Sequence, residues 1–386
     1  MLIIKDANII FEDRVEKKSL KITNGLIEKI DDFTSIDPLG CDIIDASECY
    51  LSPGFVDVHV HGGGGYSAMS ENSDDIIAMA QAHAKFGTTS IVPTTLTAPI
   101  EVLRKAVNAI DAAMKNCKGA NILGIHLEGP YISPYMKGAQ SEADILSPKV
   151  TPPDVFFEMS DNILIMGAAV EIEGGLELGR AIRSKGIVAS IAHTASDYET
   201  AYSAFMDGAF NDITHIFSAC SSMKKVGNFR VAGAAEAALV TDCTAQFIGD
   251  LRHLPEGIVK IIYKCKGADM AYAISDGLEF SAMPIVENEI YRQKNGLEVI
   301  CKEGVMQLAD LSCLAGSIAT CDKILRNLIS LDIPLTDCVK MVSTTPARVV
   351  GFGDRKGKIK EGYDADLVLL DDGFNVKTVL VNGEII

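Results

Sequence analysis

Two histidines, His59 and His61, stand two residues apart at the end of an apolar run, a spacing that suits metal chemistry. Residues i and i+2 of a β-strand lie on the same face, so both imidazoles are expected to point to one spot. The glycines at 62–65 leave room for other groups to approach closely. Because imidazole is the commonest metal ligand among side chains, this stretch predicts a metal site.

Four more residues of ligand type stand at the ends of other apolar runs, namely Glu128, His193, His215 and Asp276. If these runs are parallel strands of a barrel, their carboxyl ends meet at one mouth, where the active sites of that fold lie. Four imidazoles and two carboxylates suit Zn, Fe(II), Mn or Co. Because six groups exceed the three ligands of a simple catalytic zinc site, we expect one or two divalent ions per chain, with a carboxylate able to bridge a pair.

The chemistry expected of such a site is hydrolysis. A divalent metal lowers the pKa of a bound water from ~15.7 toward ~7, which makes hydroxide available at neutral pH. Asp276 is the candidate to take the proton of that water and to pass it to a leaving nitrogen. His253 is the candidate donor to the developing oxyanion. This arrangement favours hydrolysis of a C–N bond, although the spacing alone does not separate amides from other metal-activated electrophiles.

The elements that position these groups alternate along residues 53–345. Candidate strands are Gly54–His59, Thr89–Pro93, Ile122–Leu127, Ile163–Val170, Ile187–Ala192, Asp212–His215, Ala245–Gly249 and Met270–Ser275. Candidate helices include Asp74–Phe86, Ile100–Lys115, Leu176–Lys185, Tyr198–Gly208 and Leu311–Leu331. Eight such alternations predict a parallel sheet with crossover helices, closed into a (β/α)8 barrel rather than opened as a doubly wound sheet. No Gly-x-Gly-x-x-Gly follows the first strand, and no Gly-Lys-Ser/Thr phosphate loop is present.

The two ends of the chain differ from this middle. Residues 1–52 and 346–386 contain short β-like runs, with Asn24-Gly25 and Asn382-Gly383 as hairpin turn signals. Two β-rich ends around a different middle predict one small sheet domain built from both termini.

Composition limits the partners. The formal net charge is −17, which argues against nucleic acid and against an anionic membrane surface but leaves room for a small anionic substrate held by a local cation. No apolar run reaches the ~20 residues that a transmembrane helix needs, and the first residues lack the pattern of a signal peptide. The ten cysteines include no Cys-x-x-Cys pair, so we expect reduced thiols in a cytoplasmic protein.

Several motifs resemble the N-acetylglucosamine-6-phosphate deacetylase family of the amidohydrolase superfamily, and the match runs nearly end to end. The motifs are Pro53–Gly62 on the first strand, His126-Leu127-Glu128-Gly129-Pro130, Ala192-His193-Thr194, Thr214-His215-Ile216-Phe217, Leu314-Ala315-Gly316-Ser317, Thr344–Arg348 and Gly362–Val368. The resemblance implies a distorted (β/α)8 barrel with a β-sandwich, and a homodimer. It also implies removal of acetate from the 2-amino group of a sugar 6-phosphate in amino-sugar catabolism.

The same resemblance implies roles for the candidate ligands. Glu128, His193 and His215 correspond to the ligands of the principal metal, zinc being the first expectation, and His59 and His61 would support a second ion. Asp276 corresponds to the acid/base aspartate of the family.

Positions that correspond to the substrate contacts of the family are Ala139, Gln140, Ser218, Ala219, Arg230, His253, Leu314, Ala315 and Gly316. Gln140 stands where many members have His, and Ser218 stands where Asn is expected. Arg230 aligns with an arginine that binds the sugar phosphate. These departures concern the positions expected to contact the sugar. They therefore bear on which substrate is bound more than on which reaction is catalysed.

Alternative functions remain open at this point. The substrate could be another N-acetyl-hexosamine phosphate, such as the galactosamine epimer. A different amidohydrolase acting on a C–N bond is a second alternative, although Glu171 stands at the end of the fourth strand, where some of those relatives have a metal-bridging lysine. A scaffold or sugar-phosphate sensor without turnover is the third.

Overall fold

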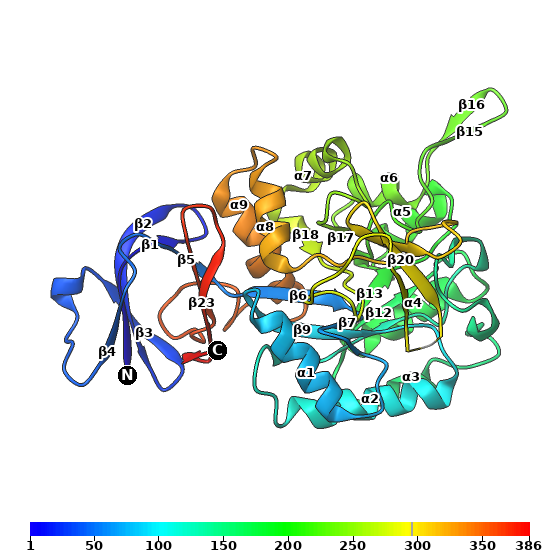
Figure 1. The fold of residues 1–386 in the computed structure, drawn as a ribbon. Helices are drawn as coiled ribbons and strands as arrows, with labels where there is room; N and C mark the ends of the chain where they lie inside the picture. The colour runs from blue at the N-terminus through cyan, green and yellow to red at the C-terminus, as the bar shows by residue number, and fades with distance from the viewer. Residues whose placement is uncertain (295) are drawn as a thin grey trace.

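The computed structural model describes residues 1–294 and 296–386, and it consists of a barrel and a smaller β domain (Figure 1). Eight parallel strands form the barrel: β6 (Phe55–Val60), β9 (Thr88–Thr95), β11 (Ile125–Glu128), β12 (Ile163–Ala168), β13 (Val188–Ile191), β14 (Asp212–Ile213), β17 (Thr244–Ile248) and β18 (Ala271–Ile274). Beyond β18, the chain closes the barrel against β6, since the Asp276 amide donates to the His59 carbonyl at 2.9 Å. The predicted barrel is therefore confirmed.

The third strand of the barrel is interrupted, which is one of its distortions. A short β10 (Asn121–Ile122) and β11 both pair with β9, and Gly124 lies between them. A Cβ at Gly124 would lie 2.5 Å from the Asn162 carbonyl oxygen, so the backbone comes too close there for any other residue.

Helices cover the outside of the barrel, and the main apolar core lies between them and the strands. They are α1 (Ser73–Ala84), α2 (Ile100–Met114), α3 (Asp154–Phe157), α4 (Gly175–Ser184), α5 (Tyr198–Met206), α6 (Ala234–Leu239), α7 (Glu256–Met270) and α8 (Cys321–Ile329). The Asn72 side chain caps α1 by accepting from the Asp74 amide, and Asp197 caps α5 in the same way. None of the helices in the described part of the chain combines the length and apolar character that a bilayer crossing requires.

The predicted helix Leu311–Leu331 is wrong over its first half, because only Cys321–Ile329 is helical. The preceding segment bonds to strands instead: the Ala315 amide donates to Met306 and the Ser317 amide to Asp276, both at 2.9 Å. Gly316 has φ of +108°, which no helix accommodates. A three-stranded antiparallel sheet that the sequence reading missed precedes this segment, comprising β19 (Ile290–Arg292), β20 (Glu298–Lys302) and β21 (Val305–Leu308).

Short elements complete the barrel. They are the hairpins β7 (Gly62–Gly63) with β8 (Tyr66–Ser67) and β15 (Lys224–Val226) with β16 (Phe229–Val231), the 3₁₀ turns η2 (Pro134–Met136) and η3 (Glu142–Asp144), the helices α9 (Leu335–Val339) and α10 (Thr345–Val349), and the π-helical η4 (Lys340–Thr344) between them.

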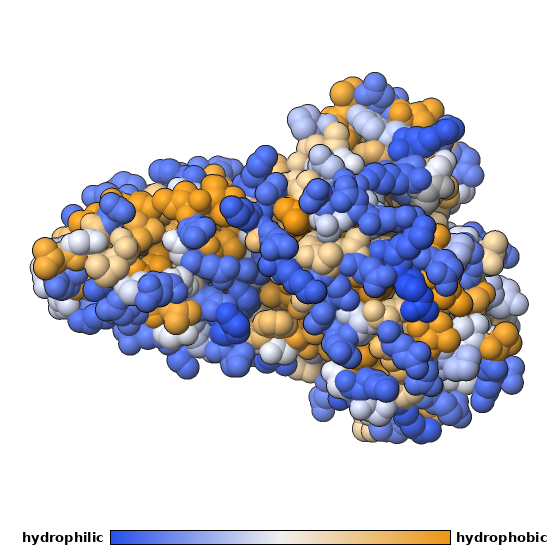
Figure 2. Space-filling view, turned by 90° about the horizontal axis from the view of Figure 1, so that it is seen from below, coloured by the Kyte–Doolittle hydropathy of each residue, from blue (hydrophilic) through white to orange (hydrophobic). Residues whose placement is uncertain are grey.

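Both termini build the smaller β-sandwich domain, as expected (Figure 1). The domain forms a separate lobe beside the barrel in the space-filling view (Figure 2). Its elements are β1 (Leu2–Ile10), β2 (Val15–Thr23), β3 (Leu26–Asp31), η1 (Phe33–Ser35), β4 (Asp42–Asp45), β5 (Tyr50–Pro53), β22 (Leu367–Leu370), β23 (Val376–Val381) and β24 (Glu384–Ile385). Strand β5 pairs with β1 on one side and β22 on the other, so it joins the two ends of the chain. The domain has its own apolar core.

The sequence predicts a small β domain of residues 1–52 plus 346–386 and a barrel of residues 53–345. These bounds stay a prediction. The second boundary falls inside α10, and Ala347 of that helix packs with Val56 and Val58 of the barrel. The buried pair of Lys356 and Asp366 lies further along the chain, just before β22 begins.

We predict that Lys356→Met lowers the free energy of unfolding by about 3–5 kcal/mol, because it leaves the buried Asp366 carboxylate without its cation, while Asp364 keeps Arg355. The Lys356 ammonium lies 2.5 Å from Asp366 and 2.9 Å from Asp364. Lys358→Met is the matched control, since Lys358 pairs with the half-exposed Glu12 and should change stability by no more than ~1 kcal/mol. Denaturant unfolding measures both, and equal effects would contradict the prediction.

Candidate metal centre and active-site cavity

Strand β6 presents both histidines of its carboxyl end to the barrel interior. Relative to β9, β6 holds one extra residue between Asp57 and Val60, and such a bulge changes the alternation of side chains. The Nε2 atoms of His59 and His61 lie 3.2 Å apart, as the i, i+2 spacing predicts. A Cβ at Gly62 would lie 2.6 Å from the backbone of Glu279, so glycine allows the close approach expected there.

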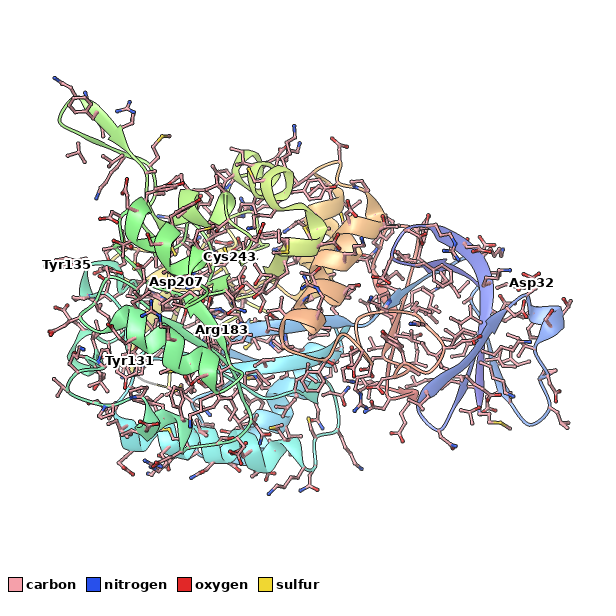
Figure 3. All side chains as sticks on the ribbon, turned by 180° about the vertical axis from the view of Figure 1, so that it is seen from behind. Asp32, Tyr131, Tyr135, Arg183, Asp207 and Cys243 are labelled. Atoms are coloured by element: carbon pink, nitrogen blue, oxygen red, sulfur yellow. The ribbon has the colours of Figure 1, made fainter. Side chains whose placement is uncertain are left out.

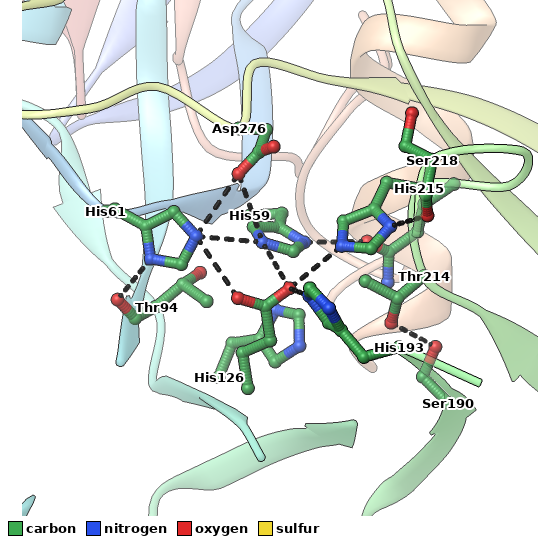
Figure 4. Close-up of polar contacts among 12 residues, drawn as sticks. His59, His61, Thr94, His126, Ser190, His193, Thr214, His215, Ser218 and Asp276 are labelled. Carbon is green, nitrogen blue, oxygen red and sulfur yellow. Dashed lines mark hydrogen bonds and ion pairs between the residues drawn. The ribbon is translucent and has the colours of Figure 1, made fainter. Parts of the chain in front are cut away.

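Glu128, His193 and His215 come from the ends of three other strands. Figure 4 shows His193 and His215 close to His59 and His61. The Glu128 Oε1 lies 3.1 Å from His193 Nε2 and 2.9 Å from His215 Nε2. The two histidines have φ of +45° and +30°, in the left-handed region that costs a non-glycine residue of order 1–3 kcal/mol. That conformation turns both rings back over the barrel mouth.

The Glu128 carboxylate stands between two groups of ligands. Its oxygens lie 3.4 Å from His59 Nε2 and 3.4 Å from His61 Nε2 on one side, with His193 and His215 on the other. Each group of three has its donor atoms within 4.8 Å of one another and could hold a metal ion. The six predicted side chains are thus brought together, with Glu128 common to both groups.

The outer nitrogens of the four imidazoles show that the cluster suits a cation. Each Nδ1 faces an oxygen that can only accept a hydrogen bond: His59 faces the Gln246 amide oxygen, and His61, His193 and His215 face backbone carbonyls, at 2.8–3.1 Å. Each Nδ1 must therefore carry the hydrogen, and in a neutral ring the Nε2 lone pair points inward. Four lone pairs facing carboxylate oxygens repel one another unless positive charge lies between them, so the donor set fits a divalent ion.

Electrostatics in the cluster lead to the same conclusion. Burial lowers the pKa of His59 to about 4. Burial also opposes the charge of His61, but hydrogen bonds to Asp276 and Glu128 outweigh it and raise the pKa of His61 to about 10. Burial alone would raise the pKa of Asp276, yet the hydrogen bond from His61 and the nearby imidazoles lower it to about 2. The cluster thus attracts positive charge and keeps Asp276 ionised at neutral pH.

Asp276 and His253, the two predicted catalytic residues, both face the same cavity. The Asp276 Oδ1 lies 3.2 Å from His61 Nε2 and 3.5 Å from His59 Nε2, and its side chain is 13% exposed. The His253 Nδ1 donates to Asp250 at 2.8 Å, which leaves Nε2 for the cavity. Asp250 also accepts from the backbone amides of Arg252 and His253, so it fixes the whole turn.

The cavity has a volume of about 430 Å³ and lies over the metal candidates. Eight of the nine predicted substrate positions line it: Ala139, Gln140, Ser218, Ala219, His253, Leu314, Ala315 and Gly316. Lining residues that the sequence reading missed are Leu96, Tyr135, Met136, Gly138, Phe217, Ile248, Leu278 and Cys313. For most of these residues, the only sign in the sequence that they line the cavity was their position next to a predicted motif. For Leu96 there was no such sign.

Arg230 is the exception, because it does not line this cavity. It lies on the β15–β16 hairpin, which projects from the barrel with its side chains in solvent (Figure 3). It borders a separate hollow at the base of that hairpin, together with Lys224. Arg230 therefore lies outside the cavity of its own chain, because the two strands pair with each other and carry it outward, and its role as a phosphate contact stays a prediction.

Two predicted sugar contacts bind the metal ligands instead. Gln140 donates to Glu128 Oε2 at 2.6 Å and accepts from the Thr97 amide at 2.7 Å. The carbonyl of Ser218 accepts from His215 Nδ1 at 2.8 Å. Both positions thus orient ligands, whatever further contact they make with a substrate.

Fold and site together define a class, and comparison with known proteins agrees: the chain belongs to the amidohydrolase family, whose profile matches residues 50–279 and 291–386. Its curated relatives include the N-acetylglucosamine-6-phosphate deacetylase of Bacillus subtilis (strain 168), 30% identical over 397 residues that cover 100% of this chain and 96% of the relative. The N-acetylgalactosamine-6-phosphate deacetylase of Escherichia coli O157:H7 is 27% identical and covers 97% and 96%.

A solved structure agrees over the whole chain. A mutant of the Mycobacterium smegmatis N-acetyl-D-glucosamine-6-phosphate deacetylase, in complex with N-acetyl-D-glucosamine-6-phosphate, has a TM-score of 0.88 at 26% identity and covers 100% of this chain and 98% of that one. The resemblance inferred from the motifs is therefore confirmed.

Proposed function

We propose that this protein is a metal-dependent deacetylase that removes acetate from the 2-acetamido group of an amino-sugar 6-phosphate, with N-acetylglucosamine 6-phosphate as the first expected substrate. The observation that carries the proposal is the Glu128 carboxylate shared by two histidine pairs, with Asp276 beside it at the floor of one cavity. Whole-length similarity to deacetylases of this substrate class supports it.

The donor set supports two ions per chain, one held by Glu128, His193 and His215 and the other by His59, His61 and Glu128. Nitrogen and carboxylate donors suit Zn²⁺ first, and Fe, Mn or Co after it. A divalent ion supplies such a site with acidification of water and polarisation of a carbonyl.

The residues of the chain then divide the proton work. The ionised Asp276 accepts a proton from the attacking water as the new C–O bond forms at the acetyl carbon, and it returns that proton to the nitrogen as the C–N bond breaks. Acetate and a free amine result. His253, held by Asp250, donates through Nε2 to the carbonyl oxygen as negative charge develops there.

The cavity has the size of a site for a small metabolite, within the ~300–1,000 Å³ typical of ligand pockets. Apolar side chains such as Leu96, Phe217 and Leu278 line it together with the polar site residues. A panel of N-acetyl-hexosamine 6-phosphates, assayed for acetate release, tests the substrate. The galactosamine epimer is the second candidate because a relative of similar identity is named for it. Absence of acetate release from every member, in metal-loaded protein, would contradict the proposal.

The phosphate needs a cation that the cavity lacks, since no Lys or Arg lines it in the described ranges. We propose a homodimer in which the β15–β16 hairpin of one subunit brings Arg230 to the cavity of the other. The exposed apolar residues of that hairpin, Val226 and Phe229, support a contact with a second copy. All ten cysteines are free, which supports a reducing, cytoplasmic location.

Metal content tests the centre. We predict two ions per chain in the wild type and one ion after His61→Ala, because His61 belongs to one of the two ligand groups. Strong chelation should remove both the metal and the activity, because the proposed hydrolysis depends on water activated by the metal. His193→Ala should remove the other ion. Elemental analysis after gel filtration measures the stoichiometry, and His83→Asn, a change at a buried histidine outside the cluster, is the control. Unchanged metal in His61→Ala would refute the second ion.

Asp276→Asn should lower kcat by about 10²–10⁴-fold, because an amide cannot accept the proton of the water. Fold and metal content should stay near those of the wild type, since Asp276 belongs to neither three-residue group. Steady-state acetate release and circular dichroism check this prediction. Turnover close to that of the wild type would remove Asp276 from the acid/base role.

Arg230→Ala should raise KM for the phosphorylated sugar roughly ten- to hundredfold, because a charge-assisted hydrogen bond contributes ~1.5–3 kcal/mol. KM for the sugar without phosphate should stay unchanged. Lys225→Ala is the control, because Lys225 is the neighbouring cation that lies opposite Arg230 on the other strand of the hairpin. An equal effect on both substrates would argue against a phosphate contact.

A further inference from the structure

A buried polar network lies inside the barrel directly below the metal candidates, where apolar side chains usually fill the interior. Its centre is Asp212 on β14, which is fully buried. Its Oδ1 accepts hydrogen bonds from Thr244 at 2.6 Å and Tyr272 at 2.9 Å, and its Oδ2 accepts from Ser190 and Gln246, each at 2.8 Å. Four donors from three other strands therefore point at one carboxylate.

The network fixes the orientation of one amide. Gln246 has one donor end and one acceptor end, and Asp212, as a carboxylate, can only accept. The Gln246 NH₂ group must therefore face Asp212, which turns its Oε1 toward His59 Nδ1, 3.1 Å away. An amide rotated by half a turn would place its oxygen against the Asp212 carboxylate, with two acceptors facing each other.

We propose that Gln246, oriented by Asp212, is a positioning residue that keeps the hydrogen of His59 on Nδ1 and thereby keeps the Nε2 lone pair at the metal centre. The inference rests on the proposed metal centre. His61, His193 and His215 need no such residue, because backbone carbonyls hold their Nδ1 atoms. His59 is the ligand whose tautomer depends on a side chain, so a substitution can change it.

The position of the network favours a role at the centre over simple filling of space. A buried carboxylate costs free energy, and four hydrogen bonds only offset that cost, so an apolar interior would serve packing at least as well. The chain of contacts, however, ends on a metal ligand. Outer partners of this kind typically change metal affinity 10–100-fold when they are removed.

The primary test is Gln246→Leu, studied without metal and then with added Zn²⁺. Nuclear magnetic resonance of isotope-labelled histidine in the metal-free protein at neutral pH reports which nitrogen of His59 carries the hydrogen. We expect the Nδ1–H form in the wild type and its loss in Gln246→Leu. In zinc titrations, the ion bound by His59 and His61 should weaken about 10–100-fold, while the ion bound by His193 and His215 keeps its affinity. An unchanged tautomer, or unchanged affinity for both ions, overturns the proposal.

An exchange of the two polar residues provides a rescue. Asp212→Asn presents an NH₂ group to Gln246, so the amide should rotate and His59 should change to the Nε2–H form. The double variant Asp212→Asn/Gln246→Glu restores the order of donors and acceptors, because the new amide at position 212 would donate to the new carboxylate at position 246, which would in turn accept from His59. Return of the Nδ1–H form and of the second zinc site supports the proposal, and failure of the double variant to recover either contradicts it.

Thr244→Val is the structural control. It removes one donor to the Asp212 Oδ1, whereas Gln246 bonds to the Oδ2, so it should lower stability yet leave the tautomer and both zinc affinities unchanged. Loss of the second ion in this variant would mean that the network acts only through stability, which would refute the positioning role. Since none of these measurements uses a sugar substrate, the inference can fail while the deacetylase function stands, and the reverse also holds.

Discussion

The structure depends above all on one shared carboxylate. Glu128 is buried and faces four imidazole nitrogens at 2.9–3.4 Å, and three of those imidazoles are held by carbonyl oxygens on their other side. Such a cluster is unstable as a set of neutral rings around an anion, because lone pairs and negative charge face one another. A divalent cation held by these side chains would resolve the conflict, and it would supply activated water beside Asp276.

The barrel supplies this geometry at a local cost. Parallel strands bring distant residues to one mouth, but regular strands would direct their end residues along the alternation of the sheet. The bulge in β6 and the left-handed conformations of His193, His215 and Asp276 change those directions. Strain of this kind persists only where the surroundings over-determine it, and here the packed strands and the hydrogen bonds that the Nδ1 atoms of His193 and His215 donate to backbone carbonyls do so.

The sequence was informative where chemistry follows local spacing. The i, i+2 histidines and the residues that end apolar runs predicted the ligands, and the alternation of elements predicted the barrel. Local patterns failed where long-range pairing decides: residues 311–320 are apolar enough for a helix, yet their amides bond to Met306 and Asp276. The place of Arg230 likewise follows from long-range pairing, since its hairpin carries it away from the cavity of its own chain, and its role as a phosphate contact stays a prediction. Gln246 had no signal at all, since its role appears only once β17 lies beside β14.

Metal binding and substrate recognition share residues in this site, and that overlap limits how specificity can change. Gln140 bonds to the shared Glu128 carboxylate, and the Ser218 carbonyl holds His215, so substituting Gln140 or moving the Ser218 backbone would alter the candidate metal centre as well as any sugar contact. Other residues, such as Tyr135 on η2, Leu314 and Phe217, line the cavity without bonding to a candidate metal ligand in the described part of the chain. Discrimination between sugar epimers can therefore vary at those positions while the hydrolytic machinery stays intact.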